Sequence, residues 1–92
     1  MTPAMALYEA RIAVAAALRV QAILFERHAA AERAEANLWN DPDATLEQLR
    51  AARQEHMAAW AAAIAGERHW EELRKQENAA IQQWVEATAE GR

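Results

Sequence analysis

Two long runs of helix-forming residues, separated by one short polar segment, set the hydrophobic pattern of this chain. The separating segment is LWNDPDAT, residues 38–45. Pro42 has no amide hydrogen and disfavours helical angles in the residue before it. Thr45 precedes Gln48 by three residues, which is the spacing of a capping box at the start of a helix. The pattern therefore predicts a turn at 39–45, where the chain folds back on itself.

The run before the turn predicts one long helix over about residues 3–38. Thr2 fits its cap, and Pro3 fits the first helical position. Residues 4–25 are apolar almost all round, which is typical of a helix that is covered on several sides. Charged residues inside this run leave no uncharged stretch of the roughly 20 residues that a membrane span needs. We therefore expect a long helix and no membrane partner.

The run after the turn contains two successive apolar stripes, one over about residues 46–65 and one over about 67–89. On a helical wheel the second stripe is rotated by about 110° from the first. Gly66 lies between them, and glycine commonly ends helices. This predicts a break or kink near Gly66. The fold class is all-α, either an antiparallel helical hairpin or a three-helix bundle, and residues 1–92 form a single helical domain.

Alanine dominates the composition, so large apolar side chains are few. One alanine-rich partner helix covers little of a helix as apolar as residues 4–25. We therefore expect the chain to self-associate, with a dimer favoured over larger assemblies. The expected self-association residues are Met5, Tyr8, Ile12, Leu18, Ile23 and Phe25.

Four tryptophans are many for a chain of 92 residues. Tryptophan fills gaps between alanine-rich helices, and it is also enriched at the energetic centres of protein interfaces. Both interpretations remain open from the sequence. If the second is correct, a protein partner of unknown identity binds the second stripe after the turn. The residues of that predicted partner-binding face are Trp70, Leu73, Ile81, Trp84 and Val85.

The sequence predicts no catalytic, metal or cofactor site. The chain has no serine or cysteine and no glycine-rich loop. None of its three histidines follows a glutamate by three residues, as di-iron bundles require, and no two histidines are four apart. His28 and Glu32 are four apart and can pair weakly. His28, His56 and His69 meet only if tertiary contacts bring them together, which the sequence does not show.

The charge balance narrows the possible partners further. The net charge is −4, and the chain has no basic run of the kind that neutralises phosphates, so we expect no nucleic-acid partner. The default compartment is the cytoplasm. The expected function is a non-enzymatic helical protein–protein interaction module, such as an adaptor, assembly factor or small regulatory subunit. One alternative is a small phage or mobile-element inhibitor that blocks a host protein surface, and another is a helical bundle that binds an apolar small molecule.

Overall fold

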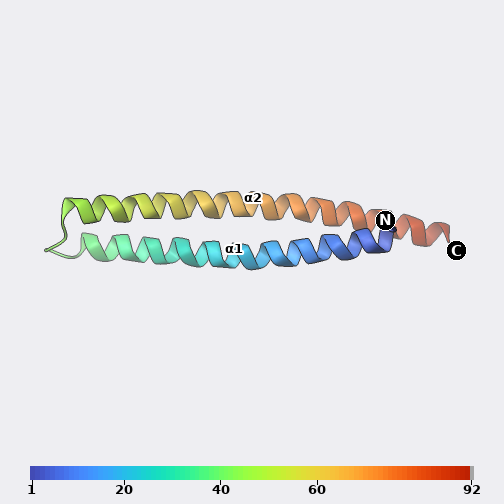
Figure 1. Cartoon of the computed structure of the whole chain (residues 1–92), viewed down its shortest axis with the longest axis horizontal. Helices are drawn as coiled ribbons and strands as arrows, with labels where there is room; N and C mark the ends of the chain where they lie inside the picture. The colour runs from blue at the N-terminus through green and yellow to red at the C-terminus, as the bar shows by residue number, and fades with distance from the viewer. Residues whose placement is uncertain (92) are drawn as a thin grey trace.

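The computed structural model describes residues 1–91 and consists of two antiparallel helices joined by a short turn (Figure 1). Helix α1 spans Pro3–Trp39, and helix α2 spans Leu46–Glu90. The molecule measures 73 × 16 × 13 Å, and the end of α2 extends past the start of α1. The prediction of an all-α helical hairpin is confirmed, and the described chain does not form the alternative three-helix bundle.

Both helices begin at threonine caps. The Thr2 hydroxyl accepts a hydrogen bond from the Met5 amide, 3.2 Å long. At the turn, Thr45 Oγ1 accepts from the Gln48 amide at 3.1 Å, and Gln48 Oε1 accepts from the Thr45 amide at 2.9 Å. This reciprocal pair is the capping box that the spacing predicted. The turn is therefore fixed by short-range contacts that the sequence already shows.

The two helices meet along a seam of buried and half-buried residues spaced alternately three and four apart. This spacing is close to the 3.6 residues of a helical turn, so it keeps one face of each helix toward the other. We use "seam" for these residues only. They are, in α1, Leu7, Ala10, Val14, Ala17, Gln21, Leu24, His28, Ala31, Glu35 and Leu38, and in α2, Leu49, Ala52, His56, Ala59, Ala63, Gly66, Trp70, Leu73, Glu77 and Ala80.

Helix α2 continues through Gly66, so the predicted break into separate helices over 46–65 and 67–89 is wrong, whereas the alternative of a kink at Gly66 stays a prediction. Gly66 lies in the seam instead. A Cβ atom at this position would come within 2.5 Å of Leu24 Cδ1 and 3.0 Å of Gln21 Oε1. The glycine therefore gives Leu24 room to pack against the backbone of α2.

The apparent rotation between the two stripes has a simple cause. In the first half of α2 the seam is filled mainly by small residues, including Ala59, Ala63 and Gly66, and the large apolar residues lie beside it. Met57 and Trp60, for example, are both about half exposed. Before Gly66 the large apolar side chains therefore mark positions beside the seam, and after Gly66 they mark positions in it. This change makes the two stripes look rotated about the helix axis.

The core is thin, because a pair of helices encloses little volume. Among the described residues no large side chain is fully buried. The exposed surface is 6893 Å², whereas a compact monomer of 10.3 kDa exposes roughly 5,400 Å². Neither helix contains, within residues 1–91, a stretch long and apolar enough to cross a membrane. Much of the apolar surface of this hairpin therefore faces outward.

Candidate functional site

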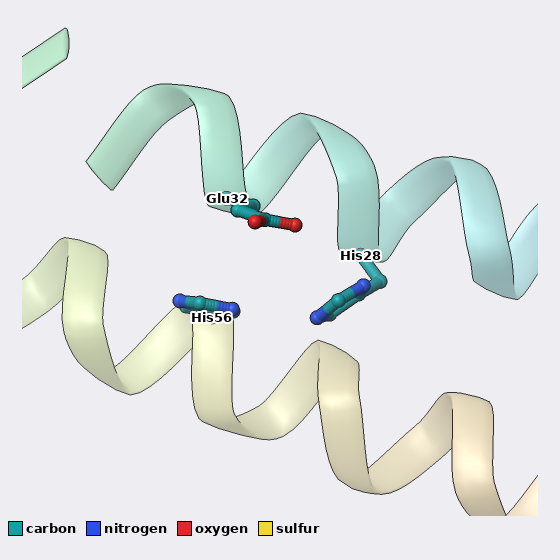
Figure 2. A group of neighbouring side chains, drawn as sticks. All are labelled: His28, Glu32 and His56. Atoms are coloured by element: carbon teal, nitrogen blue, oxygen red, sulfur yellow. The ribbon is translucent and has the colours of Figure 1, made fainter. Parts of the chain in front are cut away.

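A group of polar side chains lies in and beside the seam in the half of the hairpin next to the turn. We call it the polar layer and define it as His28, Glu32, Glu35, Arg53 and His56. Figure 2 shows His28 and Glu32 projecting from α1 toward His56 on α2. One ligand-type atom from each of these three side chains lies within 4.8 Å of the other two. The hairpin thus brings together two histidines that are 28 residues apart in the sequence.

Glu35 carries a buried carboxylate that both neighbours on α2 satisfy. Its Oε2 atom lies 2.5 Å from His56 Nδ1, and its Oε1 atom accepts from Arg53 Nη1 at 3.2 Å. The hydrogen bond from His56, followed by that from Arg53, holds the pKa of the Glu35 carboxyl below its usual value despite the opposing effect of burial. The carboxylate is ionised at neutral pH and only accepts, so His56 Nδ1 carries the proton and donates it.

His28 lies between two rings of α2. Its ring centroid is 5.1 Å from that of His56 and 5.1 Å from that of Trp60. Its Nε2 atom is buried and has no hydrogen-bond partner among the described residues. A buried polar atom without a partner costs about 1–3 kcal/mol, so native structures rarely leave one without a reason.

Ion pairs cover the outside of this same half. Arg27 on α1 donates to Glu55 on α2 at 2.8 Å, and both side chains are about half exposed. The hydrogen bond from Arg27 lowers the pKa of the Glu55 carboxyl, and that to Glu55 raises the pKa of the Arg27 guanidinium. Exposed pairs of this kind add little stability because water screens them.

An apolar surface covers the outside of the other half, on α1. We call it the apolar face and define it as Met5, Tyr8, Ile12 and Ile23. These side chains are 55%, 68%, 51% and 68% exposed, respectively. Their positions on the helix lie opposite the seam, so α2 does not cover them.

The other two residues of the predicted self-association set lie at the edge of the seam. Leu18 and Phe25 are about half exposed. Together with Gln21, Glu67 and Trp70 they line a hollow of about 200 Å³ between α1 and α2. Two atoms of these lining residues, Gln21 Oε1 and Trp70 Nε1, are buried and lack hydrogen-bond partners among residues 1–91.

The structure divides the residues of the predicted partner-binding face. Trp70 and Leu73 lie half-buried in the seam, and the Arg74 guanidinium lies 5.5 Å from the centroid of the Trp70 ring. Ile81 is half-buried, whereas Trp84 and Val85 are 42% and 46% exposed near the end of α2. Only the last two present large apolar surfaces to solvent.

Sequence reasoning missed the meeting of His28 and His56. The available signal was seam periodicity: His28 lies seven residues from both Gln21 and Glu35, which belong to the same seam. His69 is exposed and lies outside the polar layer.

No protein-family model matches this chain, and no curated protein or solved structure is significantly similar to it. The function of this chain is therefore inferred from its own geometry.

Proposed function

We propose that this chain is a non-enzymatic protein–protein interaction module that forms a homodimer through the apolar face of α1. The observation that carries the proposal is the exposure of four large apolar side chains on the side of α1 that faces away from α2. Isolated exposed apolar residues are ordinary, but several of them on one side of a helix in a small protein mark an interaction surface, although Arg19 lies on the same side between Ile12 and Ile23. The alternate three- and four-residue spacing of the seam further supports an antiparallel coiled coil as the form of each hairpin.

The surface area supports a second copy as the occupant. The hairpin exposes about 1,500 Å² more than a compact protein of its mass. A stable protein interface buries about 1,600 Å² in total, or about 800 Å² on each partner. The apolar face runs from Met5 to Ile23, a length of about 27 Å at 1.5 Å per residue. A strip of this length and one helix diameter wide covers roughly 300 Å², so the apolar face would form the centre of the interface and the flanking side chains of the hairpin would supply the rest.

The charges along α1 favour an antiparallel pairing of the two copies. Consider two copies that pair through their apolar faces around a two-fold axis at the level of Val14 along the helix. This axis places Met5 of one copy opposite Ile23 of the other, and Glu9 opposite Arg19. The same arrangement sets Ile12 against the small side chain of Ala16, so the helix axes can approach closely. A self-complementary surface of this type is what a two-fold dimer requires.

A different protein would bind the exposed end of α2. Trp84 and Val85 are about half exposed near the end of α2. Tryptophan in such a position supplies much contact area at a low entropic cost. Trp70 and Leu73 support this end of α2 by packing in the seam. The default compartment for this proposal is the cytoplasm.

The dimer is tested with a double variant, Ile12→Lys with Ile23→Lys, compared with Ala30→Lys. Ala30 lies on the same side of α1 but in the half next to the turn, so it serves as a matched control. Size exclusion with light scattering over a hundredfold range of concentration should give twice the chain mass for the wild type and Ala30→Lys. The double variant should give the mass of one chain. A wild type that is monomeric at all these concentrations would refute the dimer.

The hollow around Trp70 supports a second candidate function, the binding of an apolar small molecule. Its two unpaired polar atoms, from Gln21 and Trp70, would orient such a ligand inside an otherwise apolar lining. Tryptophan fluorescence of the wild type and of a Trp70→Phe variant tests this during a screen of aromatic compounds. A response that appears equally in both proteins would exclude the hollow as the binding site.

A further inference from the structure

We propose that His28, Glu32 and His56 bind a divalent transition-metal ion of the zinc class, which links α1 to α2. This site is independent of the proposed dimer, because it lies in the half of the hairpin next to the turn. Two ligands come from α1 and one from α2. A bound ion would therefore act as a cross-link between the helices.

The tautomer of His56 is already set for metal binding. Because Nδ1 donates its proton to Glu35, the lone pair of the neutral ring is on Nε2. Metal-binding histidines in proteins almost always donate their second ring nitrogen to a carboxylate or a carbonyl in this way. The carboxylate fixes the orientation of the ring and makes it a better ligand. Glu35 is therefore a positioning residue, and Arg53 in turn holds its other oxygen.

His28 supplies the second nitrogen. Its buried Nε2 atom has no hydrogen-bond partner among residues 1–91. Coordination of a metal ion by this atom would remove the cost of leaving it unpaired. The neighbouring rings of His56 and Trp60 hold the imidazole in place. A bound metal ion would thus explain why His28 Nε2 is buried without a hydrogen-bond partner in the packing of the two helices.

Glu32 supplies an oxygen from the same face of α1. It lies four residues after His28, so the two side chains are neighbours on the helix surface. Zinc with tetrahedral bonds of about 2.0–2.1 Å holds its ligand atoms roughly 3.4 Å apart. The three ligand atoms here already lie within 4.8 Å of one another. Because Glu32 is exposed and its side chain is long, a small change of its rotamer would bring its carboxylate within bonding distance of an ion held by the two histidines.

The ligand types indicate which metal binds. Two imidazoles and one carboxylate suit zinc, nickel or copper, whereas magnesium and calcium prefer oxygen ligands alone. Three protein ligands leave a fourth position of zinc for water or for a group from another molecule.

A polar layer in a helical seam can also serve only to fix the register of the helices. A metal titration separates these two roles.

The experiment is a calorimetric titration of the EDTA-dialysed full chain with zinc chloride, together with thermal unfolding with and without zinc. The wild type should bind one zinc per chain and unfold at a higher temperature with zinc. The His28→Gln and His56→Gln variants should each lose at least about tenfold in affinity, and Glu35→Gln about 10–100-fold. His69→Gln removes a histidine outside the polar layer and should bind as tightly as the wild type.

Two further variants keep the test decisive. Glu32→Gln changes an exposed position, so it should keep the helical circular dichroism of the wild type even if the histidine variants do not fold, and it should bind zinc more weakly. The Ile12→Lys with Ile23→Lys variant should bind zinc normally, because the apolar face lies outside the site. Equal binding by the wild type and a His28→Gln, His56→Gln double variant would overturn the proposal. So would the absence of zinc binding, or one zinc shared by two chains.

Discussion

The half of the hairpin next to the turn and the half at its open end fill the same seam with different chemistry. Next to the turn, the seam contains His28, Glu35 and His56, and ion pairs such as Arg27–Glu55 cover the outside. At the open end, the seam contains residues such as Leu7 and Val14, and the outside of α1 is apolar as well. The two halves have the same backbone arrangement, so the difference is one of side chains alone.

This difference indicates a division of roles. Apolar burial stabilises in proportion to the area removed from water, so we expect the open end to supply most of the energy that holds the helices together. Burial of histidine and glutamate stabilises a protein only when their polar atoms are paired. Among the described residues His28 Nε2 is unpaired, as are Gln21 Oε1 and Trp70 Nε1 beside the hollow. Under the metal-site proposal, the half next to the turn gives up some stability in order to hold a set of metal ligands together.

The largest expected effect comes from placing an unpaired charge in the seam of the open end. Ala80 is 8% exposed there, on the face of α2 that packs against α1. We expect Ala80→Glu to lower the free energy of unfolding by about 3 kcal/mol, because it buries a carboxylate between two apolar helix faces. Urea unfolding followed by circular dichroism measures the change.

The control for this variant is Ala79→Glu, one residue earlier in α2 at an exposed position. A surface change of this kind should alter stability by less than about 0.5 kcal/mol. If both variants lower the free energy of unfolding by the same amount, the seam at the open end is not the main source of stability. The proposed division of roles between the two halves is then wrong.

A smaller effect is expected from filling the space beside Gly66. Gly66→Leu forces a side chain against Leu24 and Gln21, and such overpacking costs about 1–3 kcal/mol despite the better helix propensity of leucine. Ala65→Leu adds the same side chain on the outside of α2 and should leave stability nearly unchanged. Urea midpoints of the two variants give the comparison. A more stable Gly66→Leu protein would show that the glycine only weakens the helix.

The features that the sequence predicted correctly are the local ones. The turn follows from Pro42 and its polar neighbours, and the capping box follows from the spacing of Thr45 and Gln48. Each depends on residues a few positions apart. Contacts at this range are visible in the order of the residues, because the chain itself holds the interacting groups together.

The features that could not be predicted from the sequence depend on contacts between the two helices. Gly66 looked like a helix end, and its role became clear only from Leu24 across the seam. Metal-ligand spacings within one helix do not reveal that His28 and His56 meet, because the register of the hairpin brings them together. That register depends on the turn and on small seam residues, which the positions of the large apolar residues do not reveal.

The smallest expected effect separates stability from binding in the half next to the turn. In the presence of EDTA, His28→Leu should raise the free energy of unfolding by about 1 kcal/mol, because it removes an unpaired buried nitrogen and adds apolar contact. With excess zinc the order should reverse, since a ligand that binds only the folded state stabilises the wild type and not the variant. The matched change His69→Leu should alter stability under neither condition. If His28→Leu is less stable than the wild type without metal, the imidazole stabilises the seam by itself, and the polar layer gives up no stability for binding.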